Sequence, residues 1–255
     1  MVDLFVVAAL AAGLVGVSTL ASRLWGHAIG GIVSAFPLIV GPVLLLAATR
    51  EDAAFAAQTA TATLLGLVAL CGFAFAYGRS PRRWGWLPSV ALGWAAAAGI
   101  GLLAARIEGG LLGALAVAVL SIVLARAALP QGETTGPSDA LPVWELPVRM
   151  AMTVLLIVGL TLAAGQFGPV VAGILAALPT LASVLTVFTH ARDGRDALLS
   201  LLRGMLAGLG AFVIFCAAIA VLIEPAGVAL AFVLATSAAV LAQLASARLH
   251  VRALG

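Results

Sequence analysis

Charge is scarce in this chain, and lysine is missing altogether. Only 9% of the 255 residues are charged, and all thirteen basic residues are arginine. With 64% hydrophobic residues and a mean hydropathy of +1.21, the chain has too few polar side chains to cover a folded surface in water. The composition predicts an integral membrane protein whose surroundings are the lipid bilayer. The arginines stand in short loops between apolar runs, which argues against a nucleic-acid partner.

Catalytic and metal-binding groups are also sparse. The two cysteines, Cys71 and Cys216, stand alone in apolar surroundings, which favours packing over a disulfide or a metal site. No His, Cys and Asp cluster has metal-ligand spacing, and no serine or threonine has a recognisable base nearby. We therefore expect no cofactor and no enzymatic activity.

Carboxylates are missing from the middle of every apolar run. All ten acidic residues fall in loops or at helix ends, which argues against a proton relay or a divalent-metal permease built on a buried carboxylate. These residues are Asp3, Glu51, Asp52, Glu108, Glu133, Asp139, Glu145, Asp193, Asp196 and Glu224.

Apolar runs long enough to cross a bilayer recur along the chain. A helix needs about 20 such residues to span the hydrocarbon core. The sequence predicts an all-α polytopic membrane protein with nine transmembrane helices, at residues 4–22, 28–48, 54–77, 87–106, 109–127, 147–165, 169–190, 197–222 and 226–247. Because Asp3 precedes the first run and no arginine or lysine does, we expect a retained helix and not a cleaved signal peptide.

Arginine placement predicts the orientation. With nine crossings, every arginine except Arg50 and Arg106 falls on one side of the membrane. Cytoplasmic loops retain positive charge, so we expect the N-terminus outside, the C-terminus in the cytoplasm, and a bacterial-type inner (plasma) membrane.

One apolar segment occurs twice. The stretch from Gly26 to Pro37 returns as Gly168 to Pro179, so the two prolines are 142 positions apart. The first copy starts outside and the second starts inside, which predicts an inverted repeat of helices 1–4 and 6–9. We expect a first membrane repeat at residues 1–107, a linker helix and cytoplasmic loop at 108–146, and a second, inverted repeat at 147–255.

Proline breaks a helix, and paired breaks in inverted repeats are where many transporters bind. Pro37 and Pro179 therefore mark a candidate substrate site. Thr180 and Ser183 follow the second proline at helical spacing, and Ser34 precedes the first. Each hydroxyl has an alternative role, because serine and threonine in membrane helices often bond back to their own backbone.

Two further residues are candidates for substrate binding. Gln58 lies among threonines in the third predicted helix, where it either faces a polar path or forms an interhelical bond. Arg203 lies about two turns into the eighth helix, where it either reaches the inner headgroups or meets an anionic group in a cavity.

The second half resembles a known family. Its Ala177-Leu178-Pro179-Thr180 break and its Ala191-Arg192-Asp193-Gly194 loop are similar to those of the GlpM-type small inner-membrane proteins, which are short four-helix chains of poorly defined function. The resemblance covers residues 147–247, and more weakly 4–106, and implies two such units fused through an extra helix. The first copy departs from it, with Leu38 for Thr180 and Gly41 for Ser183. A homodimer is left open, because units of this size often pair.

These patterns favour a small secondary transporter or permease. Its substrate would be a neutral, weakly polar or amphipathic small molecule, with a lipid-like anion at Arg203 included. Two alternatives stay open: a channel-like pore, and a structural or assembly subunit of a membrane complex that transports nothing.

Overall fold

The computed structural model describes residues 2–80, 84–107, 109–131, 142, 144–166 and 179–252, and every regular element among them is a helix. Six of these helices are long and apolar enough to cross a membrane. The chain is therefore an all-helical, multi-pass membrane protein. Its helices are α1 (Val2–Trp25), α2 (His27–Ser34), α3 (Val40–Arg50), α4 (Ala53–Arg79), α5 (Trp86–Ala104), α6 (Gly110–Ala128), α7 (Glu145–Gln166), α9 (Thr180–Ala226) and α10 (Val228–Arg252).

Six predicted spans correspond to single helices within a few residues, namely α1, α4, α5, α6, α7 and α10. The predicted span at 28–48 is instead two helices, α2 and α3, separated by residues 35–39. Of the predicted span at 169–190, residues 169–178 lie outside the described residues. The rest continues into the span predicted at 197–222 as the single element α9.

The break predicted between those last two spans is present, but a kink takes the place of the predicted loop. Gly194 has φ 81° and ψ −169° inside α9, while the residues on either side stay helical. That positive φ is a conformation that glycine adopts without the steric cost of a Cβ. A single residue therefore turns the chain where we expected several.

The break between α2 and α3 follows from Pro37. Proline has no N–H to donate, and its ring clashes with a preceding helical turn. Here the Leu38 N–H donates to the Phe36 carbonyl at 2.8 Å, and the Gly41 N–H donates to the Pro37 carbonyl at 3.1 Å and begins α3. The expected proline break is present at this position.

Two glycine contacts bring α2 unusually close to the second part of α9. A Cβ added at Gly31 would lie 2.0 Å from the Leu201 carbonyl oxygen, and one at Gly204 would lie 2.0 Å from the Ala28 carbonyl oxygen. Small residues allow such an approach between membrane helices. The largest apolar core lies alongside, where Phe73 and Tyr77 of α4 pack with leucines of α9.

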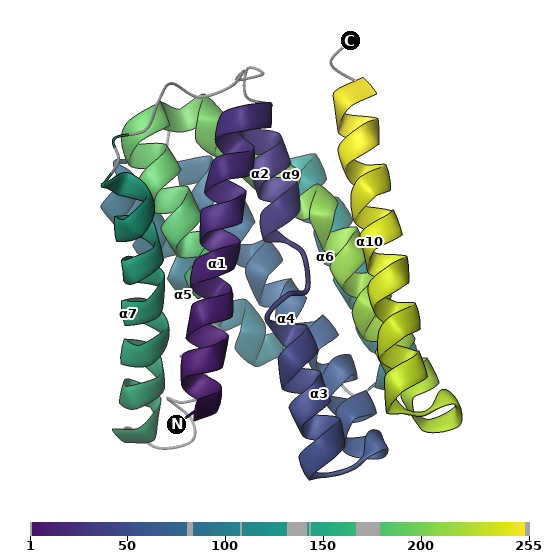
Figure 1. Ribbon diagram of the computed structural model, residues 1–255. Helices are drawn as coiled ribbons and strands as arrows, with labels where there is room; N and C mark the ends of the chain where they lie inside the picture. The colour runs from purple at the N-terminus through teal and green to yellow at the C-terminus, as the bar shows by residue number, and fades with distance from the viewer. Residues whose placement is uncertain are drawn as a thin grey trace.

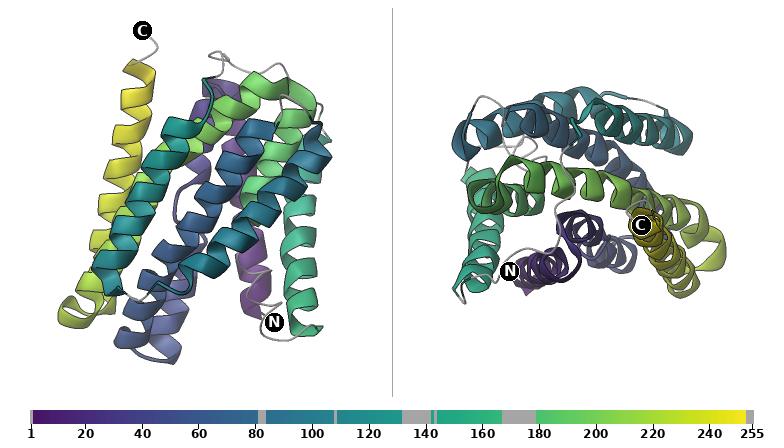
Figure 2. Two further views of the ribbon diagram at one scale, coloured as in Figure 1. Left: turned by 180° about the vertical axis from the view of Figure 1, so that it is seen from behind. Right: turned by 90° about the horizontal axis from the view of Figure 1, so that it is seen from above.

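Adding 142 to the residue numbers pairs α1 with α7, α3 and α4 with the two parts of α9, and α5 with α10. The paired helices run in opposite directions (Figure 1). α1 rises from the N-terminal end of the bundle and α7 descends. The chain descends through α2 and α3, and it rises through the first part of α9. α4 rises and the second part of α9 descends, while α5 descends and α10 rises (Figures 1 and 2). The two chain termini consequently lie at opposite ends of the bundle.

Arginines gather at one of those ends. α1, α4 and α6 end there, each with an arginine in its last turn: Arg23, Arg79 and Arg126. α3 ends at the opposite end with Arg50. We call the first the arginine-rich end.

Candidate functional site

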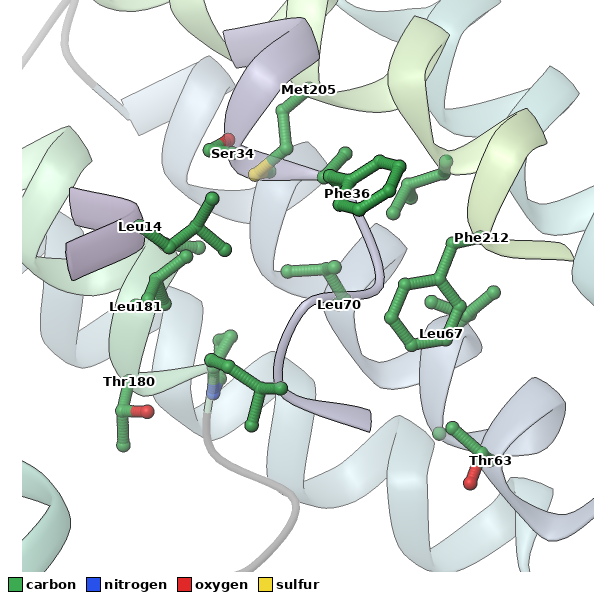
Figure 3. Close-up of a pocket in the computed structure, with 16 residues that line it drawn as sticks. Leu14, Ser34, Phe36, Thr63, Leu67, Leu70, Thr180, Leu181, Met205 and Phe212 are labelled. Carbon is green, nitrogen blue, oxygen red and sulfur yellow. The ribbon is translucent and has the colours of Figure 1, made fainter. Parts of the chain in front are cut away.

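A cavity of about 300 Å³ lies between the α2–α3 break and the start of α9 at Pro179. Ala35, Phe36 and Ile39 contribute to its wall from the break between α2 and α3, and Pro179 and Thr180 contribute from the start of α9. The remaining wall comes from α1, α4 and the second part of α9 (Figure 3). Segments distant in sequence thus line one partly open cavity.

The wall is almost entirely apolar. No charged side chain among the described residues lines the space. Leucines, phenylalanines and a methionine surround it, namely Leu14, Phe36, Leu67, Leu70, Leu181, Met205, Leu209 and Phe212. The hydroxylic residues are Ser34, Thr63 and Thr180. A ligand would therefore be held mainly by hydrocarbon contact.

Two hydroxyl groups in the cavity wall donate hydrogen bonds to the backbone of their own helices. Ser34 Oγ donates to the Gly31 carbonyl at 2.7 Å, and Thr63 Oγ1 donates to the Thr59 carbonyl at 2.7 Å. A hydroxyl whose proton is already donated retains only acceptor capacity toward a ligand. For Ser34, the backbone bond that was the alternative at the sequence level is thus present, although the residue also lines the cavity.

The structure brings together most of the predicted residues around the breaks. Pro179 and Thr180 line the cavity, as Ser34 does, whereas Pro37 is buried in the break behind the wall. Ser183 lies outside the wall, where its Oγ accepts a hydrogen bond from Trp94 Nε1 at 2.7 Å and donates to the Pro179 carbonyl at 2.7 Å. It holds the start of α9 in place.

Gln58 and Arg203 lie elsewhere. Gln58 is exposed and lines a separate pocket with Ile107 and Glu224, toward the end of the bundle opposite the arginine-rich end. Arg203 Nη1 donates to the carbonyls of Leu129 at 3.1 Å and Pro130 at 3.5 Å, directly after α6. Its guanidinium satisfies carbonyls at that helix end and does not face the cavity.

A cluster of interacting acidic and basic side chains, several of them buried, was missed by the sequence reasoning. Glu145 is 3% exposed and accepts hydrogen bonds from Arg149 Nε at 3.0 Å and from Arg192. Asp193 lies 3.0 Å from His27 Nε2 and 3.6 Å from Arg192 Nε. We call His27, Glu145, Arg149, Arg192 and Asp193 the charge cluster. The four-residue spacing of Glu145 and Arg149 on one helix was a signal for part of it.

These contacts do not provide a metal site. Within the parts of the chain that the structure describes, no group of three His, Cys, Asp or Glu side chains is placed to hold a metal ion. Cys71 and Cys216 are both buried and free.

Comparisons with known proteins identify no relative. No protein-family model matches the chain, and neither the curated proteins nor the solved structures contain a significant match to it. The resemblance to GlpM-type proteins therefore stays a prediction.

Proposed function

We propose that this protein is a secondary transporter or permease of a bacterial-type inner membrane, and that the cavity at the two proline breaks is its substrate site. One observation carries the proposal: residues of the α2–α3 break and residues at the start of α9, beside the two repeated prolines, line a single cavity of a membrane helix bundle. Paired helix breaks around a central site are typical of transporters built from inverted repeats.

The proposal includes an inverted repeat of α1–α5 and α7–α10, with α6 as the connecting helix. The opposite directions of the offset-related helices support it. The concentration of arginines at one end supports a cytoplasmic location for that end, and hence an N-terminus outside. Rocking of one repeat against the other would expose the cavity to each side in turn.

The wall of the cavity supports an uncharged solute that is largely hydrocarbon. An apolar cavity of about 150 Å³ holds one benzene ring, so a cavity twice as large has room for roughly twelve non-hydrogen atoms. A charged group placed there would lack a partner on the described wall, which is costly in a low-dielectric site. An anionic lipid headgroup at Arg203 is not supported, because that side chain bonds elsewhere.

The test is uptake by purified protein in proteoliposomes. The solute panel should pair uncharged aromatic and aliphatic alcohols with carboxylates of the same size, and with polyols as hydrophilic controls. We expect saturable uptake of the alcohols and none of the carboxylates. Uptake of no solute in either direction would contradict the transporter, whereas flux that never saturates would favour a pore.

A variant that fills the cavity tests whether the solute passes through it. A Cβ at Gly66, which lines the cavity, would meet nothing within 4 Å, so Gly66→Phe fills the space without a backbone clash. Gly99→Phe is the matched control, because Gly99 also has open space around it and lies on an exposed part of α5. We expect only Gly66→Phe to abolish saturable uptake, and equal uptake by both variants would place the path elsewhere.

A further inference from the structure

The charge cluster joins helices from both halves of the chain. His27 begins α2, Glu145 and Arg149 are in the first turns of α7, and Arg192 and Asp193 directly precede the kink of α9. The contact between His27 and Asp193 connects α2 to α9, and the contact between Glu145 and Arg192 connects α7 to α9.

The cluster lies between the cavity and the arginine-rich end. Along α2, His27 is seven residues before Ser34, which is about 10 Å of helix. Along α9, Asp193 is eleven residues after Ala182, which is about 17 Å. The intervening layer is closely packed, because Gly31 and Gly204 hold α2 against α9 and Val15 and Leu185 are buried beside them.

The charges in this position are largely shielded from water. Glu145 and Arg149 are each 3% exposed, and the Arg149 guanidinium lies 5.1 Å from the centre of the Phe188 ring. The adjoining pocket, lined by Arg23, His27 and Asp193 among others, is only about 10 Å³, which is too small for a solute. Buried charges of this kind are stable only while their partners stay in place. Moving α2 or α7 away from α9 would separate those partners.

The offset of 142 residues adds a second observation. It relates Glu145 to Asp3, Arg192 to Arg50, and Asp193 to Glu51, so three charged positions of the cluster have counterparts of the same sign. Arg50 and Glu51 lie at the opposite end of the bundle and are exposed, as Arg192 is, whereas Asp193 is partly buried. Charges at these three positions therefore recur at both ends of the bundle, whereas His27 and Arg149 have no charged counterpart.

We propose that the charge cluster is the closure of the solute path at the arginine-rich end, and that it separates when the cavity opens to that side. This proposal rests on the transport function proposed above. The structure then represents the state that is closed at the arginine-rich end.

The test measures access to the cavity and does not depend on knowing the solute. In a background with Cys71→Ala and Cys216→Ala, Thr63→Cys places a thiol in the cavity wall. A charged, membrane-impermeant thiol reagent is added to one face or the other of oriented vesicles. We expect Glu145→Gln and Asp193→Asn each to raise the labelling rate from the arginine-rich face by about tenfold, because each shifts the population toward the open state.

Asp196→Asn is the matched control. Asp196 pairs at 3.4 Å with its neighbour Arg195, so removing its charge breaks no contact between helices. We expect its labelling rate to stay at that of the parent. The double variant His27→Asp, Asp193→His swaps the two side chains and keeps a contact between them. Its labelling rate should therefore be closer to that of the parent than the rate of Asp193→Asn is. Equal rates in Glu145→Gln, Asp193→Asn and Asp196→Asn, or a rise from both faces, would overturn the closure.

A second measurement applies where a charge-neutral variant fails to fold. A short bismaleimide that joins His27→Cys to Asp193→Cys should hold the closure shut and prevent labelling of the cavity thiol from the arginine-rich face. Fast labelling after complete cross-linking would overturn the proposal. If the parent transports no solute while these access results hold, the transport function fails and the closure stands.

Discussion

Replacing Gly31 with alanine should separate α2 from α9. The added Cβ would lie 2.0 Å from the Leu201 carbonyl oxygen and 2.7 Å from the Met205 nitrogen. Ordinary van der Waals contact requires about 3.5 Å, and backbone atoms have no rotamer with which to yield, so the helices must move apart by roughly 1.5 Å. Overpacking of this kind costs about 1–3 kcal/mol, and the better helix propensity of alanine offsets up to about 1 kcal/mol. We expect a net loss of about 1–2 kcal/mol.

The assay is reversible unfolding in mixed micelles, with Gly13→Ala as the control. Gly13 lies within α1 and has nothing within 4 Å of an added Cβ, so alanine there should stabilise the protein by up to about 1 kcal/mol. The same helix contact contains Gly204, whose Cβ would meet the Ala28 carbonyl oxygen at 2.0 Å. Because one separation relieves both clashes, Gly31→Ala and Gly204→Ala should cost less together than the sum of their single effects. Equal stability of Gly31→Ala and Gly13→Ala would refute the close approach.

Three other substitutions separate packing roles from solute contact. Arg203→Met should lower the free energy of unfolding by about 1–3 kcal/mol, because it removes charged hydrogen bonds to the Leu129 and Pro130 carbonyls, and should leave the uptake KM unchanged in proteoliposomes. Trp94→Phe should cost about 1 kcal/mol in the same unfolding assay, since it deletes the donor to Ser183 Oγ. Gln58→Leu should leave uptake unchanged because its side chain lies in a separate pocket, and a large loss of uptake would return Gln58 to the solute path.

The parts of the fold that sequence predicted are those set by local chemistry. Apolar runs of about 20 residues specify helices long enough to span a bilayer, and six of the predicted spans became single helices. The break at Pro37 was predictable for the same reason, because the missing N–H is a property of that residue alone. Residues around both prolines do line one cavity, although Pro37 itself does not.

The parts that sequence could not predict depend on distant partners. Ser183 and Trp94 are 89 positions apart, and Arg203 and Leu129 are 74 apart, so no local pattern indicates that these groups meet. The kink at Gly194 was predicted as a loop because its polar neighbours resemble one. Those neighbours, Arg192 and Asp193, belong to the charge cluster, and their burial depends on the position of α7 and α2.

The residues that follow the two repeated prolines differ in their side chains. In the second half, Ser183 receives a hydrogen bond from Trp94 and donates to the Pro179 carbonyl, which fixes the start of α9. The equivalent position in the first half is Gly41, where an added Cβ would meet only the Phe215 ring, at 3.7 Å. No comparable side-chain bond can form there, because glycine has neither donor nor acceptor beyond its backbone. The residues after the two prolines are therefore not interchangeable, because only those after Pro179 tie the start of a helix to a tryptophan of α5.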